Sequence, residues 1–200
     1  MGSENILQNI LIDANESVLV LIDIQDLFLN KLVRESAHLI VNHAGWLIEI
    51  AKILSIPIIV TAEDIALCGS ITTSLAEKLP PNTPVYNKMI FNLADNPEII
   101  EAVEKTGRKT TILAGLETDV CIAQSAIGLM QSGYKVAMVA DACASPGEAQ
   151  AIGLERMRNA GILLSSCKSL YYEWVRGVEE SEEMSQGHFP EIGTPKGIIL

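Results

Sequence analysis

The chain has 200 residues, of which 48% are hydrophobic and 20% charged, a size and composition that suit one globular domain with a sizeable core. Its net charge of −11 argues against nucleic acids and anionic membranes as partners, because both repel an acidic surface. No apolar run reaches the roughly 20 residues of a membrane span, and the N-terminus does not resemble a secretory signal, so we expect a cytoplasmic protein.

Apolar segments of two kinds alternate along the chain. Continuous β-branched runs are typical of strands buried on both faces, and apolar residues at helical spacing indicate helices. The expected strands are 17–24, 56–62, 84–88, 110–116, 134–141 and 162–166. The expected helices are 35–54, 72–78, 96–107, 119–132, 147–161 and 168–178. This alternation predicts an α/β domain with a mainly parallel sheet and helices on both faces.

We expect residues 1–200 to form one domain, with no internal repeat and no linker. Residues 1–16 are interpreted as an N-terminal extension, and about 179–200 as a C-terminal tail that starts with an acidic run. The apolar end of this tail, at 198–200, would fit burial against a neighbouring subunit, and disorder is the alternative.

Three chemically active side chains follow different predicted strands. Asp23 ends the first strand, Lys88 follows the third, and Cys121 comes soon after the fourth. In a parallel sheet, ligands bind beyond the carboxyl ends of the strands, so these residues are candidates for one site. Taken singly, each also has a plain structural interpretation: a turn cap for Asp23, a solvated loop cation for Lys88, and a packing residue for Cys121.

Together the three residues suggest nucleophilic catalysis. Cys121 is expected in the first turn of a helix, where the positive helix end and a nearby lysine would lower the pKa of its thiol. Asp23 would take the thiol proton and later return it to a leaving amine, while Lys88 holds charge beside both groups.

The chain resembles the isochorismatase-like cysteine hydrolase superfamily, which includes nicotinamidases and N-carbamoylsarcosine amidase. The similar stretches are VLVLIDIQDLF (18–28), NKMIFNL (87–93) and AGLETDVCIAQSAIGLMQSGYKVAMVADA (114–142). The resemblance implies a Rossmann-like three-layer α/β/α sandwich around a six-stranded sheet, and assembly into a homo-oligomer. It also implies an Asp23–Lys88–Cys121 triad, a cis peptide at Leu116–Glu117, and an oxyanion hole formed by the backbone N–H groups of Glu117 and Cys121.

The loops around these residues should contact a small-molecule substrate. We assign that role to Gln25, Phe28, Glu63 and Phe91, of which Gln25 matches a glutamine near the triad in the resembled superfamily. Nicotinamidases bind a metal through an Asp-x-His segment after the second strand, but here that segment is TAEDIALCGS (61–70), without histidine. His38 and His43, five residues apart, do not share a helix face, so we expect no metal site and no cofactor.

The sequence therefore predicts a metal-independent cysteine hydrolase that cleaves a small amide or related C–N bond through an acyl-enzyme on Cys121. Two alternatives stay open. One is vinyl-ether cleavage of the isochorismatase type, which Cys121 argues against because true isochorismatases lack that nucleophile. The other is a binding or scaffold protein in which Cys121 is a redox-sensitive thiol. The remaining cysteines, Cys68, Cys143 and Cys167, are expected to be reduced.

Overall fold

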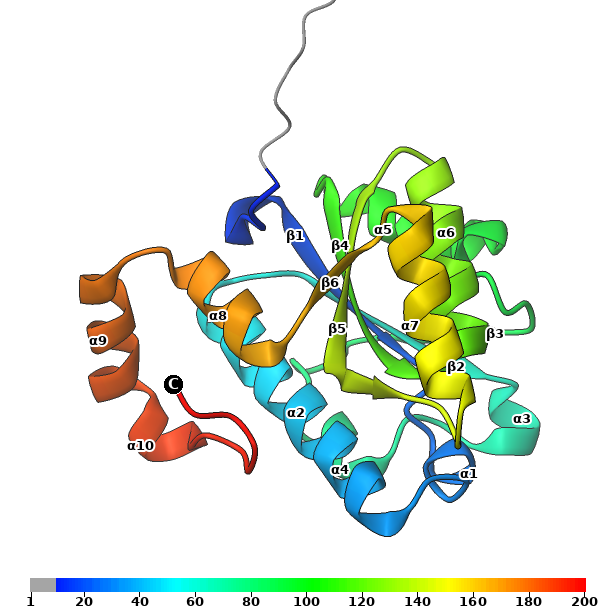
Figure 1. Ribbon diagram of the computed structural model, residues 1–200, viewed down its shortest axis with the longest axis horizontal. Coiled ribbons are helices and arrows are strands. Elements are labelled where there is room, and N and C mark those ends of the chain that lie inside the picture. The colour runs from blue at the N-terminus through cyan, green and yellow to red at the C-terminus, as the bar shows by residue number, and fades with distance from the viewer. Residues whose placement is uncertain (1–9) are drawn as a thin grey trace, which may run out of the picture.

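The computed structural model describes residues 10–200, and a single six-stranded sheet forms its centre (Figure 1). The strands are β1 (Ser17–Ile22), β2 (Ile58–Glu63), β3 (Val85–Lys88), β4 (Thr110–Leu116), β5 (Lys135–Ala144) and β6 (Leu163–Ser165). They lie in the order β3-β2-β1-β4-β5-β6, and every pair is parallel. The connections change direction between β1 and β4, which is the place where sheets of this kind bind ligands.

Helices cover both faces of the sheet and make the expected three-layer sandwich (Figure 1). The α-helices are α1 (Asp26–Leu29), α2 (Arg34–Ile53), α3 (Ile65–Cys68), α4 (Thr73–Ala76), α5 (Pro97–Lys105), α6 (Ala123–Gln131), α7 (Ala149–Ala160), α8 (Cys167–Val175), α9 (Val178–Gly187) and α10 (Phe189–Ile192). Short 3-10 turns are η1 (Ala14–Glu16) and η2 (Leu93–Asp95), and η3 (Thr118–Ile122) is a π-helical turn. Helices α2 and α8 pack on one face, and α5, α6 and α7 on the other.

Local sequence accounts for these elements. Every residue of β1 and β4 is buried, which is why both strands are mainly apolar along their whole length rather than alternating. Helix α5 lies within the predicted range 96–107. The Asn96 side chain accepts from the N–H groups of Glu98 (3.1 Å) and Ile99 (3.3 Å), and Pro97 is the first helical residue. The α/β class and the parallel sheet are confirmed.

Two predicted elements differ from the structure around the fourth strand. The single helix expected over 119–132 is divided into the π-helical turn η3 and the regular helix α6. Strand β5 continues to Ala144 because it stays paired with β4 beyond an irregularity between Leu113 and Gly115. Both differences lie beside Cys121, where the regular hydrogen bonding of the strand and of the helix is interrupted.

The segment expected as a tail, about 179–200, forms helices α9 and α10 and packs on the domain. The acidic run lies in α9, which still buries Met184. The Phe189 ring packs 5.7 Å from that of Tyr171 and 6.3 Å from that of Trp46, between centroids. A few apolar residues within this polar segment are enough to pack it against the domain. Part of the N-terminal extension, residues 1–9, lies outside the described residues, and Ile12 is buried.

The helices found between residues 10 and 200 are all too short or too polar to cross a membrane.

Candidate active site

Asp23 stands directly after β1 in a left-handed conformation, with φ of 53°. Few non-glycine residues adopt this conformation, although aspartate tolerates it better than most. Thr61 on β2 holds Asp23 twice: its carbonyl accepts from the Asp23 N–H (3.1 Å), and its hydroxyl donates to Oδ1 (3.0 Å). The side chain is 1% exposed, so its carboxylate is fixed beneath the carboxyl edge of the sheet.

Lys88 is the last residue of β3, and its side chain is fully buried. The Nζ atom lies 2.9 Å from Asp23 Oδ2 and 3.5 Å from Cys121 Sγ, and it donates to the Ile90 carbonyl at 3.2 Å. The structure therefore brings the three predicted side chains together, with Lys88 Nζ in contact with both of the others.

The backbone between β4 and α6 explains the sequence that precedes Cys121. Gly115 has φ of 138°, and a Cβ atom there would lie 1.9 Å from the carbonyl oxygen of Ile22. The Leu116–Glu117 peptide is cis, as the family resemblance implied. Turn η3 then presents Cys121, which is 4% exposed.

The predicted oxyanion donors lie in this same loop. The N–H groups of Val120 and Ile122 both donate to the Glu117 carbonyl (3.1 Å each), and the Asp119 N–H donates to the Ser145 hydroxyl (3.2 Å). These bonds hold the loop in one conformation. The backbone N–H groups of Glu117 and Cys121 therefore stay our candidates for stabilising an oxyanion.

The expected lowering of the Cys121 pKa is wrong. Burial raises the pKa of the Cys121 thiol, and the Asp23 carboxylate raises it further, while Lys88 opposes both. Burial also raises the pKa of Asp23 against the influence of Lys88. For Lys88, burial alone would lower the pKa, but Asp23 and Cys121 reverse the shift and keep the ammonium charged. The lysine is shared with a carboxylate, so it cannot act on the sulfur alone.

A cavity of about 260 Å³ opens onto the sulfur. It is lined by Asp23, Phe28, Lys31, Glu63, Phe91, Leu116, Glu117, Val120 and Cys121. Three of the four predicted substrate contacts are thus in its wall. The fourth, Gln25, is fully buried and absent from the wall, and its side-chain amide bonds to the backbone of Glu63, the last residue of β2, and of Gly69.

Sequence reasoning missed one feature of the wall, an ion pair between Lys31 and Glu117 with an Nζ–Oε1 distance of 2.8 Å. The same ammonium lies 4.6 Å from the centroid of the Phe28 ring. Both side chains are partly exposed, so the pair lies at the mouth of the cavity. The residues are 86 positions apart in loops, and no periodic signal could have paired them.

Two groups of side chains between residues 10 and 200 place potential metal ligands within 4.8 Å of one another. The first is Asp23, Glu63 and Cys121, where Lys88 Nζ already lies 2.9 to 4.0 Å from an atom of each. An ammonium in this position supplies the positive charge that a cation would bring.

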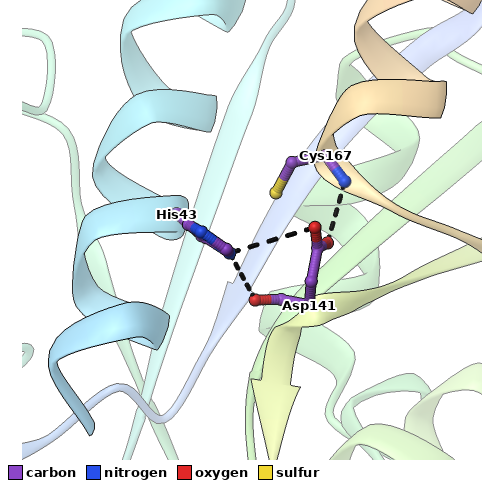
Figure 2. A group of neighbouring side chains, drawn as sticks. All are labelled: His43, Asp141 and Cys167. Carbon is purple, nitrogen blue, oxygen red and sulfur yellow. Dashed lines mark hydrogen bonds and ion pairs between the residues drawn. The ribbon is translucent and has the colours of Figure 1, made fainter. Parts of the chain in front are cut away.

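The second group, His43, Asp141 and Cys167, lies away from the cavity and joins α2, β5 and α8 (Figure 2). His43 Nδ1 is 2.6 Å from the Asp141 carbonyl, and Nε2 is 3.2 Å from the carbonyl of Lys196. Asp141 Oδ1 accepts from the Cys167 N–H at 2.8 Å, at the start of α8. These bonds account for the cluster as a structural junction that also holds the C-terminal segment.

The isochorismatase domain family model matches residues 17–168. A MAR1 ribonuclease from Caenorhabditis elegans superposes with a TM-score of 0.80 at 26% identity, covering 94% of this chain and 97% of its own. YcaC from Pseudomonas aeruginosa, solved with hexane-2,5-diol and covalent acrylamide, gives 0.78 at 26% identity over 91% and 93% of the two chains. YcaC from Escherichia coli, described as an octameric hydrolase of unknown specificity, gives 0.79 at 25% identity over 91% and 92%.

Proposed function

This chain belongs to the isochorismatase domain family, and from that premise we propose that it cleaves a small amide or related C–N bond through an acyl-enzyme on Cys121. One observation carries the proposal: Lys88 Nζ lies 2.9 Å from a buried carboxylate and 3.5 Å from a sulfur that lines a cavity. A base and a nucleophile thus line one cavity, and a buried cation lies beside both of them. The cavity, at about 260 Å³, suits a small substrate.

In the first half of the reaction, the Cys121 sulfur attacks the carbonyl carbon and its proton passes to Asp23. The carbonyl oxygen becomes an oxyanion near the N–H groups of Glu117 and Cys121. When the C–N bond breaks, Asp23 returns the proton to the leaving nitrogen, and an amine or ammonia departs. Asp23 then takes a proton from water, whose oxygen attacks the thioester and releases the acid and the thiol.

The raised pKa of Cys121 determines when the nucleophile forms. At neutral pH the resting sulfur is a thiol, so its proton must move as the substrate carbonyl arrives. Asp23 must be ionised to accept that proton, and its pKa lies above the usual carboxyl value. We therefore propose that the acid limb of activity falls at a higher pH than an ordinary aspartate would give.

The proposed chemistry needs no metal. Lys88 supplies a fixed positive charge between the two carboxylates and the sulfur, at the position where a cation would bind. That arrangement favours direct attack by the sulfur over activation of a metal-bound water.

A panel of small amides, followed by mass spectrometry of the intact protein, tests the function. We expect ammonia release and an acyl adduct on residue 121. Cys121→Ala should abolish both, whereas Cys68→Ala, which removes a partly exposed thiol outside the cavity wall, should leave turnover unchanged. Turnover that survives Cys121→Ala would refute the proposal.

Isochorismate and RNA belong in the same panel. Isochorismate tests vinyl-ether cleavage, and RNA tests the activity named for the MAR1 relative. The net charge of −11 disfavours RNA, which is a polyanion, and Cys121 argues against vinyl-ether cleavage, so we expect neither compound to be consumed. If Cys121 reacts with oxidants but no compound is turned over, the redox-scaffold alternative is favoured.

We also propose that the chain forms a homo-oligomer, supported by the octameric YcaC of similar fold. Light scattering coupled to size-exclusion chromatography measures the assembly directly, and a mass of about 21.6 kDa, one chain, would refute it. A cytoplasmic location stays a prediction.

A further inference from the structure

Glu63, the last residue of β2, brings a second carboxylate to the sulfur. Its Oε2 atom accepts a hydrogen bond from the Cys121 thiol at 3.5 Å and lies 4.0 Å from Lys88 Nζ. The side chain is 26% exposed and lines the cavity, whereas Asp23, which also lines it, is only 1% exposed. A molecule that enters therefore meets the Glu63 carboxylate beside the reacting sulfur.

Gln25 fixes the position of Glu63. The Gln25 amide donates to the Glu63 carbonyl (2.8 Å) and to the Gly69 carbonyl (2.7 Å), and its oxygen accepts from the Glu63 N–H (2.7 Å). Gln25 is fully buried, so its side-chain bonds serve the loop rather than a ligand. This clamp holds the backbone from which the carboxylate projects, and a preorganised acceptor binds a donor at low entropic cost.

Of the three carboxylates that line the cavity, Glu63 has the most distant cation. Lys88 forms its short contact with Asp23 at 2.9 Å, and Lys31 forms its own with Glu117 at 2.8 Å. Glu63 stands 4.0 Å from an ammonium that already has a closer partner. A carboxylate on the substrate would meet repulsion here, whereas an N–H donor would complete a charge-assisted hydrogen bond.

We propose that Glu63 determines substrate class by accepting an N–H from the group bonded to the attacked carbon. The site would take primary amides and ureas, neutral or cationic, and reject molecules with a carboxylate at that position. The identity of the reaction rests on the proposed function, but recognition by Glu63 can be measured without turnover. Gln25 is a positioning residue in this scheme.

Iodoacetamide and iodoacetate are the matched probes, because they differ only in an amide against a carboxylate. In each alkylation the Cys121 sulfur displaces iodide and gives up its proton. Rates at Cys121 are measured by peptide mass spectrometry, in the folded protein and in urea. We expect the ratio of the iodoacetamide rate to the iodoacetate rate to be at least tenfold larger in the folded protein than in the urea-unfolded protein. Changes in the thiol pKa cancel in this ratio.

Glu63→Gln should reduce the folded ratio by about tenfold, because the amide accepts no charge-assisted bond and repels no carboxylate. Asp64→Asn is the matched control: it removes one charge at the next residue, whose side chain caps α3 outside the cavity wall. Thermal melting checks that each variant is folded. If Glu63→Gln is not folded, Glu63→Asp, which keeps the charge, is used in its place.

Glu63→Asp should retain the wild-type preference in part, between the wild-type and unfolded ratios. Three results would overturn the inference: an equal ratio in folded and unfolded wild type, an effect of Asp64→Asn as large as that of Glu63→Gln, or a Cys121 as inert to both reagents as buried Cys143. None of them depends on amide turnover. Failure of the amide panel therefore refutes the proposed function and leaves the recognition result to be judged separately.

Discussion

Lys88→Met tests the buried ion pair most directly. The substitution removes the ammonium, keeps an unbranched apolar side chain, and leaves Asp23 with its Thr61 hydrogen bond as the remaining support. Both partners are almost completely buried, at 0% and 1% exposure. Breaking a buried pair by removing one member costs about 3–5 kcal/mol of unfolding free energy, because the other charge is left without compensation.

Asp23 can limit this cost by taking up a proton. Protonating a carboxyl group with an ordinary pKa near 3.9 at pH 7 requires about three pKa units, or about 4 kcal/mol. The expected loss is therefore about 3–4 kcal/mol at pH 7. The folded variant would hold a proton that the unfolded chain releases. Over the pH range in which Asp23 of the wild type stays ionised, the loss should therefore shrink by about 1.4 kcal/mol for each pH unit below 7.

Urea unfolding followed by circular dichroism at pH 5, 6 and 7 measures this loss. The double variant Asp23→Asn/Lys88→Met is the matched control, since it removes both charges and should recover most of the stability with little dependence on pH. A single variant as stable as the wild type at pH 7, or a loss of equal size at pH 5 and 7, would refute the reasoning.

Three further predictions concern the scaffold. Gly115→Ala should prevent soluble expression, because its Cβ would lie 1.9 Å from the Ile22 carbonyl, whereas Gly161→Ala, with φ of 90° and open space around it, should lower the unfolding free energy by only about 1–2 kcal/mol. Burial raises the pKa of the three buried thiols, those of Cys121, Cys143 and Cys167. The unfolded chain ionises these thiols near pH 8.5 while the folded chain keeps them protonated, so stability should be full below that pH and fall above it by about 4 kcal/mol per unit in urea titrations. Phe189→Ala should cost about 2 kcal/mol, roughly half of a full core truncation because the ring is partly buried, and should make the C-terminal helices more sensitive to limited proteolysis.

The convergence of Asp23, Lys88 and Cys121 could be predicted because it follows from topology. Parallel strands place their carboxyl ends at one edge, so residues that end separate strands meet there whatever their distance in sequence. Apolar runs locate strands well, and β4 was predicted to the residue. The sheet class follows from local pattern, and the choice of the three side chains follows from their places at the strand ends and from the family resemblance.

Features that depend on competing interactions could not be predicted in this way. The sign of the Cys121 pKa shift depends on how deeply the thiol is buried and on whether the opposing effects of Asp23 and Lys88 balance. Neither quantity can be obtained from the sequence. The Gln25 side chain faces the end of β2 and the loop after it rather than the cavity, because it makes three hydrogen bonds with backbone groups there. The C-terminal helices were missed because a few apolar contacts outweighed an acidic, polar composition.

The shared lysine explains how a site with a protonated thiol can still supply a nucleophile. Moving the proton from Cys121 to Asp23 shifts one negative charge from a position 2.9 Å from Lys88 Nζ to one 3.5 Å from it. At an effective dielectric constant of 20, the attraction to the ammonium weakens by only about 1 kcal/mol. The pair therefore stays compensated on both sides of the transfer. The raised thiol pKa measures the free energy needed to release the Cys121 proton to solvent. The proposed reaction transfers that proton to Asp23 instead and never releases it to solvent.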